Sequence, residues 1–323
     1  MKRITLSALL MTLFLLLSCG SGSTNTEELK SKFLNVFTSF GDMVTNAFGI
    51  KADTKKSEVG NYFTAIAKTM TSVKNELQES VAKNENYSKV KSVVDQFINT
   101  LGTIAEGASE AAKGATTDTA IGNAVKDQEG APGEAASVNA LVKGIREIVG
   151  AVLKDDEGSA GATKTGNTEQ KSVGKLLGGK DNGGTDAHAA AASASIGAVT
   201  GADILQAIAK SAEAGTGEVD IDKAKNAAEI AVAKNEDKEF GAILQDKDAV
   251  IAAGIALRAM AKDGKFAAKN EDKSANAVNG AVASAVNKTL STLIIAIRKT
   301  IDRNLKLINE ALAKPADATG GNQ

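Results

Sequence analysis

Cysteine, histidine and tryptophan are almost missing from this chain. Its 323 residues hold one cysteine, one histidine and no tryptophan. A single histidine cannot supply a histidine-pair zinc site, and no cysteine lies beside it to form a catalytic pair. His188 lies within an alanine run, so we expect a surface or partly buried side chain without a catalytic role.

Aromatic residues are also scarce, at 3 % of the chain. Glycosidases hydrolyse sugars with paired carboxylates, but few rings are present here to stack on a sugar. These absences together predict a protein that is not an enzyme.

Two glycine-rich stretches nearly match a phosphate-binding loop. Residues 161–168 have the glycine spacing and the final threonine, but Asn167 stands where the lysine should be. Residues 174–181 have Lys180, but an acid follows it in place of the serine or threonine that binds the metal. Neither follows a strand-like run, so we interpret both as coincidences of composition and expect no cofactor.

Two pairs of acids hint at calcium. Asp220 and Asp222 form one pair, and Asp246 and Asp248 form the other. Neither pair has the glycine and the distal glutamate of a calcium-binding loop. Acids at the start of a helix cap it and complement its dipole, so we expect no metal site.

Neither sign of charge dominates the chain. It holds 38 basic and 39 acidic residues, and loss of residues 1–18 removes two basic ones, so 36 − 39 leaves a net charge near −3. This balance gives no basis for binding nucleic acid. Beyond those residues no run is continuously apolar over the about 20 residues that a membrane helix needs, so a soluble body is expected.

The first residues have the pattern of an export signal. Lys2 and Arg3 precede an apolar run over residues 4–17, which is too short to span a bilayer. The sequence Leu16-Leu17-Ser18-Cys19-Gly20 resembles the lipobox that is cleaved before a cysteine, so the mature chain would begin at Cys19. Acylation of Cys19 would explain an odd cysteine in an exported protein, and several acyl chains would anchor it stably. The alternative is an ordinary signal peptide with an incidental cysteine.

Helical periodicity covers much of the remaining chain. Apolar residues recur at three- or four-residue spacing in four segments. The four stripes are Leu29, Phe33, Val36, Phe40 and Val44; Val59, Phe63, Ile66, Met70, Val73, Leu77 and Val81; Val90, Val94, Phe97, Leu101 and Ala105; and Val286, Leu290, Leu293, Ile297, Ile301, Leu305, Ile308 and Leu312. Pro315 follows the last stripe, where a helix should end. We expect an all-α fold, an elongated helical bundle with thin, alanine-rich interfaces, in which the N- and C-terminal helices pair near the membrane.

Residues 107–217 differ in composition from the stripes. Aromatics vanish there, and Gly, Ala, Thr, Asp and Asn dominate. We expect short helices over residues 138–153 and 187–214, and loops over residues 155–166 and 178–184. The segment is either a low-complexity linker or a surface that tolerates sequence change. Loops at the distal end of a rigid stalk can vary without disturbing a core.

These patterns predict a division of the chain. Its parts are a signal peptide (1–18), an acylated cysteine with a flexible tether (19–26), a helical body (27–313) with a variable middle (107–238), and a C-terminal tail (314–323). The small polar residues 20–26 would act as a spacer between lipid and fold.

One phrase occurs twice in the body. Residues 233–238 and 268–273 both have the sequence Ala-Lys-Asn-Glu-Asp-Lys, and residues 82–86 are a shorter relative. Each ends an apolar helical pattern with polar turn formers, so we expect a reused junction between helices.

Residues 245–267 have the most specific pattern. They predict an acid-capped helix that ends at a glycine, with Ile251, Ile255 and Met260 facing the core. Arg258 and Lys262 suit the negative end of the helix dipole in its last turn.

The same segment closely resembles the invariable segment of the variable large proteins of relapsing-fever spirochaetes. It is equally similar to the related variable surface antigen of Lyme spirochaetes. Residues 1–6 with the lipobox, residues 49–55 and residues 297–302 also resemble that family. Gly254 departs mildly from the family's pattern, and a glycine inside a helix should cost about 1 kcal/mol relative to alanine.

The resemblance implies an all-helical protein of the outer surface, with constant helices near the outer membrane and variable loops outward. It implies antigenic switching, in which one such gene is expressed at a time and host antibody is evaded. The implied partners are outer-membrane lipid, through acyl chains on Cys19, and host antibodies.

Two other functions remain open beside the antigen. A surface adhesin or host-protein-binding lipoprotein would use Arg298, Lys299, Arg303 and Lys306 as a basic patch for host surface molecules. A solvated face near anionic headgroups is the alternative for those residues. An exported enzyme is disfavoured by the missing histidine, cysteine and aromatic residues.

Overall fold

Helices make up the regular structure, as predicted. The computed structural model describes residues 49–82, 87–179 and 181–313, and within these ranges there are helices and isolated β-bridges but no β-strand. The helices are α3 (Lys56–Ala82), α4 (Tyr87–Ala112), α5 (Ala135–Val152), α6 (Asn167–Ser172), α7 (Asp186–Ala198), α8 (Gly201–Ala209), α9 (Ala227–Val232), α10 (Asp248–Met260) and α11 (Asp272–Ala313), with the short 3-10 helices η1 (Val173–Leu176), η2 (Ile221–Lys223) and η3 (Ala242–Leu244).

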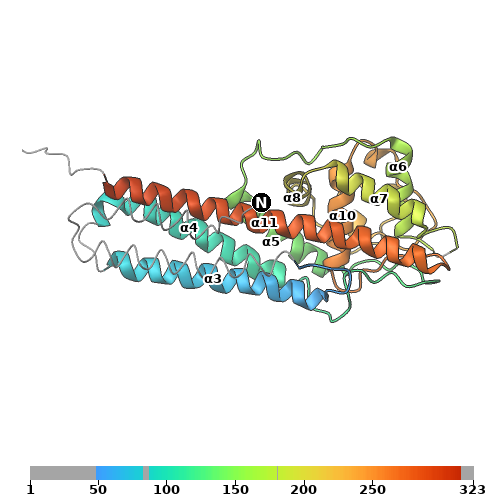
Figure 1. The fold of residues 1–323 in the computed structure, drawn as a ribbon, viewed down its shortest axis with the longest axis horizontal. Coiled ribbons are helices and arrows are strands. Elements are labelled where there is room, and N and C mark those ends of the chain that lie inside the picture. The colour runs from blue at the N-terminus through green and yellow to red at the C-terminus, as the bar shows by residue number, and fades with distance from the viewer. Residues whose placement is uncertain (1–48, 83–86, 180, 314–323) are drawn as a thin grey trace, which may run out of the picture.

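The molecule is elongated along α11, which confirms the predicted shape. α11 has 42 residues and is therefore about 63 Å long. Its C-terminal half lies beside α4 at one end of the molecule, and its N-terminal half lies beside α7 and α10 at the other (Figure 1). α4 packs against both α3 and α11. One end is therefore a narrow helical bundle, and the other is a wider head of short helices and loops.

The apolar stripes form the core of the bundle. The stripes of α3, α4 and α11 are buried from Val59 to Leu77, from Val94 to Ala105 and from Val286 to Ile308. The stripe over residues 29–44 lies outside the described residues. The three-or-four spacing therefore identified the buried faces of the three longest helices.

α4 and α5 cross where two glycines meet. A Cβ on Gly144 would lie 2.2 Å from the carbonyl oxygen of Gly107 and 2.4 Å from the amide nitrogen of Ala111. A Cβ on Gly107 would lie 2.6 Å from the carbonyl oxygen of Gly144. Because the backbones touch here, neither position has room for a side chain, as expected for thin helix interfaces.

The middle of the chain is more ordered than a linker. α5 agrees with the helix predicted over residues 138–153, and ten of its residues are buried: Ser137, Val138, Ala140, Leu141, Val142, Gly144, Ile145, Ile148, Val149 and Val152. Residues 107–112 belong to α4. The linker alternative is therefore wrong for this segment, which contributes helices to the core.

The single helix predicted over residues 187–214 is wrong. The chain bends by 95° between α7 and α8, and α8 ends at Ala209. Val199 is extended, and the side chain of Thr200 accepts from the amide of Asp203 and so starts a new helix. A Cβ on Gly201 would lie 1.8 Å from Oγ1 of Thr292, so α8 begins against α11. This break was missed in the sequence, because Thr200 and Gly201 did not stand out as a helix boundary within this alanine-rich segment.

One described helix, α11, could cross a membrane by its length and composition, as could α7 and α8 if they formed one bent span. This corrects the expectation that no such segment follows residue 18. The apolar stretch of α11 is 56 % buried, and it packs against α4, α5, α7, α8 and α10. This burial is what a core helix of a soluble body requires.

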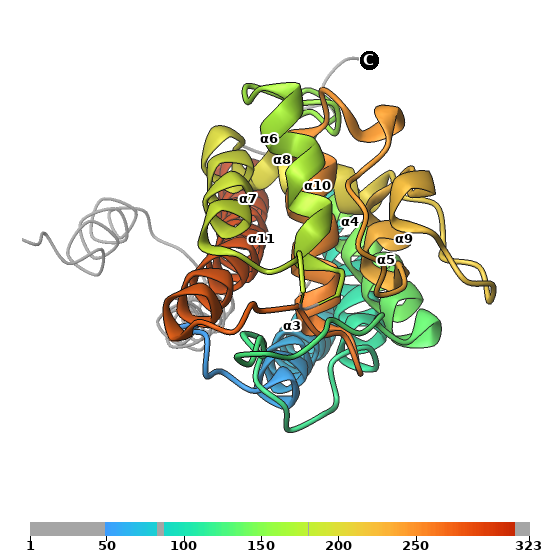
Figure 2. The ribbon, with the colours of Figure 1, turned by 90° about the vertical axis from the view of Figure 1, so that its right-hand side faces the viewer.

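α10 runs through the middle of the head. Viewed along the long axis, α7 and α11 lie on one side of it, and α5 and α9 lie on the other (Figure 2). α8 also contacts it. The segment with the most specific sequence pattern is therefore the one that other helices surround.

Gly144→Ala tests the close crossing of α4 and α5. We expect it to lower the free energy of unfolding by about 1–3 kcal/mol, because the new methyl group forces the helices apart. Gly150→Ala, in the same helix, is the control, since nothing lies within 4 Å of its Cβ position. The control should raise stability by up to about 1 kcal/mol through helix propensity. Equal urea-unfolding midpoints for the two variants would refute the glycine crossing.

Candidate functional surface and its buried supports

α10 is buried along its whole length. All 13 of its residues are buried, whereas the sequence pattern predicted one inward face with Ile251, Ile255 and Met260. Those three are in the core, but the opposite face is covered as well. The reason is that helices contact α10 on several sides, and its many alanines let them come close.

α9 packs tightly against α10 at Gly254. A Cβ there would lie 2.4 Å from Cγ2 of Ile230. Glycine lowers the helix propensity at this position, but a larger residue would prevent the close packing of α9 on α10. The departure of Gly254 from the family's pattern therefore has a structural cause.

Arg258 is a buried cation at the C-terminal end of α10. Its Nε donates to the carbonyl oxygen of Lys265 at 2.9 Å, and Nη1 donates to that of Ala233 at 2.6 Å. The guanidinium carbon lies 5.9 Å from the centre of the Phe266 ring, within cation–π range. Burial lowers the pKa of Arg258 to about 9. The sequence placed Arg258 in the last turn, but its role extends beyond the helix dipole.

Lys56 is a second buried cation, at the start of α3. Its Nζ donates to the carbonyl oxygens of Ala261 and Gly264 at 2.6 and 2.7 Å. Burial, and next the charge of Arg258, lower the pKa of Lys56 to about 8. The first residue of the bundle helix thus holds the turn that follows α10. No pattern in the sequence singled out Lys56, because lysine usually lies on the surface.

Asp248 joins α10 to the loop before α6. Its carboxylate accepts from the amides of Lys164 and Thr165 at 2.7 and 2.9 Å, and from the Thr165 hydroxyl at 2.6 Å. Burial raises the pKa of Asp248, but these hydrogen bonds outweigh it and hold the pKa below its usual value. We expected Asp248 to cap its own helix, but its carboxylate binds a distant loop instead.

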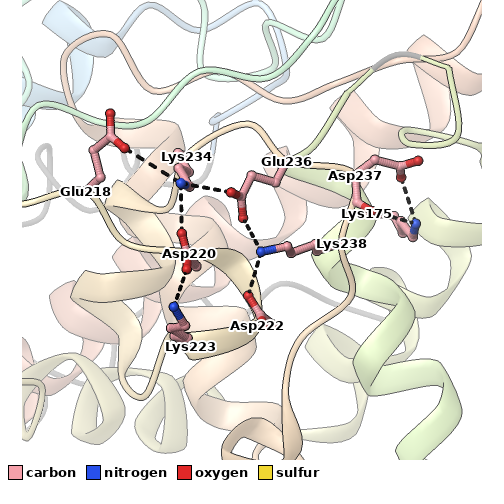
Figure 3. Close-up of polar contacts among 9 residues, drawn as sticks. All are labelled: Lys175, Glu218, Asp220, Asp222, Lys223, Lys234, Glu236, Asp237 and Lys238. Atoms are coloured by element: carbon pink, nitrogen blue, oxygen red, sulfur yellow. Dashed lines mark hydrogen bonds and ion pairs between the residues drawn. The ribbon is translucent and has the colours of Figure 1, made fainter.

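A network of ion pairs covers the loops on the α9 side of the head (Figure 3). Lys234 lies 2.8 Å from Asp220 and 2.9 Å from Glu236. Lys238 lies 3.1 Å from Glu236 and 3.3 Å from Asp222. Hydrogen bonds from Lys223 and Lys234 lower the pKa of Asp220. Single exposed pairs contribute little, but these pairs share partners and connect two loops.

The repeated phrase lies at a junction between helices in both copies, as predicted, although only the first copy directly follows a helix. Residues 233–238 follow α9, but residues 268–273 lead into α11. Both copies begin at an alanine in an isolated bridge, from Ala233 to Val219 and from Ala268 to Gln128. In both, the glutamate amide donates to the lysine carbonyl two residues earlier, at 3.0 and 2.6 Å. The shared structure is thus a bridge followed by a tight turn; residues 83–86 lie outside the described residues.

The outer surface of the head consists mainly of loops. Residues 155–166 and 178–184 are without helix where they are described, as predicted, and exposed residues are frequent in 154–169, 215–218 and 234–243. These loops gather at the end of the molecule away from Ala313 (Figure 1). This exposed surface, resting on α10, is the candidate functional surface.

His188 and residues 161–168, which the sequence singled out, take structural positions in the head. His188 is half-buried and caps α7 through a reciprocal bond with Thr185, and burial lowers its pKa. Residues 161–168 form a loop and the start of α6. The part of the chain that the structure describes has no group of three acids, histidines or cysteines able to hold a metal.

The basic residues of α11 are partly matched by acids. Arg298 lies 3.9 Å from Asp302, and Lys306 lies 3.7 Å from Glu310, each one turn further along the helix. Lys299 and Arg303 are exposed. The positive charge of this face is therefore reduced, which gives an adhesive basic patch no added support.

Comparisons with known proteins agree with the resemblance found in the sequence. The pattern of the Borrelia lipoprotein family matches residues 33–312. Variable large protein 4 of Borrelia hermsii is 57 % identical, over 97 % of this chain and 96 % of its own. Variable large protein 17 of the same organism is 57 % identical, over 91 % of this chain and 87 % of its own.

A solved structure has the same fold. The crystal structure of the Lyme disease variable surface antigen VlsE of Borrelia burgdorferi superposes with a TM-score of 0.77, at 34 % identity. It covers 89 % of this chain and 97 % of its own.

Arg258→Met tests the buried support at the end of α10. We expect it to lower the free energy of unfolding by about 3–5 kcal/mol, because it leaves buried carbonyl groups without a donor. Arg298→Met is the control, since its long, partly exposed pair with Asp302 should contribute less than about 1 kcal/mol. Denaturant unfolding of both variants measures the difference, and similar losses would show that Arg258 does not support the head.

Proposed function

We propose, from the premise that this chain belongs to the Borrelia lipoprotein family, that acyl chains on Cys19 hold it at the outer membrane. The protein is a surface-exposed lipoprotein and a variable surface antigen, as its relatives are, and its function is antigenic variation. Its relatives are surface antigens, which favours a role other than catalysis. What we add is how the molecule stands on the cell and which parts meet host antibody.

The orientation follows from the two unlike ends of the molecule. The bundle end holds the end of α3 and the end of α11, while the exposed loops gather at the head (Figure 1). If residues 29–44 formed a further helix of this bundle, the tether of residues 19–26 and Cys19 would lie at the bundle end. The proposal therefore puts the bundle next to the membrane and the head outward, with residues 314–323 as a tail at the membrane side.

The main support for this antigenic surface is the difference in solvent exposure between α10 and the loops that cover it. α10 is buried throughout, so antibody cannot reach it on a folded molecule. Exposed residues are frequent in the loop stretches 154–169, 215–218 and 234–238, and these stretches contribute no side chain to the buried apolar core. Exchange of such loops alters little buried surface, and loop entropy grows only slowly with length.

The adhesin alternative lacks an observation in its favour. Salt-sensitive binding to heparin or to a serum protein, lost on charge reversal of Lys299 and Arg303, would be needed to support it. Binding without that salt dependence would place any host contact elsewhere.

Cys19→Ala tests the anchor. Expressed in a spirochaete, this variant should leave the detergent phase and lose acyl label, because without acyl chains the soluble body has no attachment to lipid. Ser18→Ala keeps the cysteine and a small residue before it, so it should still partition into detergent. A Cys19→Ala protein that stays in the membrane with acyl label would show that lipidation occurs elsewhere.

Antibody mapping tests the exposed surface. Antisera raised against whole cells should lose binding when the exposed residues Asp155, Asp156 and Lys164 are replaced together by alanine. The matched control replaces Asn75, Gln78 and Glu79, which are exposed on α3 in the bundle, and should change binding less. Antibody against residues 248–262 should bind unfolded protein and not live cells. Strong live-cell binding by that antibody would overturn the division between exposed loops and a sheltered α10.

A further inference from the structure

Three buried charged side chains contact the surrounding segments largely through main-chain groups. Arg258 donates to the carbonyl oxygens of Leu177, Ala231, Ala233 and Lys265. Lys56 donates to the carbonyl oxygens of Ala261 and Gly264. These acceptors belong to three separate segments of the chain, at residue 177, residues 231–233 and residues 261–265. Neither cation has a carboxylate among its hydrogen-bond partners.

Asp248 follows the same rule with the opposite charge. Two of the donors to its carboxylate are the amides of Lys164 and Thr165, at 2.7 and 2.9 Å. The hydroxyls of Thr163 and Thr165 add two further bonds, at 3.2 and 2.6 Å. The side chain of Lys164 itself is exposed, so at this position the loop is held by its backbone amide while the side chain faces solvent.

Main-chain groups do not depend on which amino acid is present. Every residue supplies a carbonyl oxygen, and every residue except proline supplies an N–H. A loop that is bound through its main-chain groups keeps these hydrogen bonds when its side chains change. A loop that is bound through its side chains would lose the hydrogen bonds.

We propose that Asp248, Arg258 and Lys56 are positioning residues, which hold the loops of the head by main-chain groups so that loop side chains can change without loosening them. This inference rests on the proposed function, because it gives the physical condition for a changing surface on a constant frame. Close backbone contacts limit which loop positions can change. A Cβ on Gly178 would lie 2.3 Å from the carbonyl oxygen of Glu236, and one on Gly184 would lie 2.3 Å from that of Ala267. These two positions inside the loops must therefore stay glycine.

Two substitutions of Lys164 in the loop before α6, and one at the start of α6, separate the contribution of the backbone from that of the side chain. In the full mature chain, Lys164→Ala keeps the N–H and should leave the Tm within about 1 °C of the parent, as for most surface changes. Lys164→Pro removes the N–H that Asp248 accepts and should lower the Tm by roughly 2–6 °C. Asn167→Pro is the matched control. It lies at the first position of α6 after an extended Gly166, where proline is tolerated, and it should behave as the parent does.

A second variant makes the test specific to Asp248. Asp248→Asn replaces one acceptor oxygen with a donor, so the loop amides should exchange hydrogen at least about tenfold faster. In the Asp248→Asn background, Lys164→Pro should lower the Tm much less than it does in the parent, because the hydrogen bond that it removes is already lost. Equal losses from Lys164→Ala and Lys164→Pro, equal losses from the two prolines, or full additivity with Asp248→Asn would each overturn the proposal. Antibody mapping could fail while these results hold, so the two proposals fail separately.

Discussion

The buried guanidinium of Arg258 is the interaction on which the head of this molecule depends. A fully buried charge is tolerated only when hydrogen bonds replace the water that it lost. Here backbone carbonyls from segments before α9, after α9 and after α10 supply the replacement. Segments far apart in sequence must therefore arrive at one point, at the end of a helix that is itself enclosed.

Close packing around α10 follows from small side chains. Gly254 admits Ile230, and Gly107 and Gly144 bring α4 to α5. With few aromatic rings available, the core gains stability from short distances between many helices. Close packing of the helices distinguishes two kinds of position. Residues at the helix contacts cannot change without a steric clash, whereas exposed loop side chains are limited mainly by solubility. A variable antigen needs this distinction.

The sequence predicted the regular parts of the fold and missed what joins them. The stripes of α3, α4 and α11 were found because burial on one face leaves a period in the sequence. The break at Thr200 was missed although its capping box with Asp203 is a local signal; the contact of Gly201 with α11 has no signal in the sequence. Of the candidate supports, Arg258 was assigned only to a helix dipole and Asp248 only to a cap, and Lys56 was not considered. Their partners are distant backbone groups, which have no sequence signature. The anchor at Cys19 remains a prediction from its lipobox.

Native-state hydrogen exchange of α10 tests the enclosed frame most directly. Amides that open only when the whole protein unfolds exchange with the free energy of global unfolding, whereas locally mobile segments exchange with less. If α10 is the frame that all segments enclose, the amides of Ile251 to Met260 should be among the slowest in the protein. Their exchange should follow global unfolding as denaturant is added. Exchange of α10 at the rate of the exposed loops, independent of denaturant, would contradict the account.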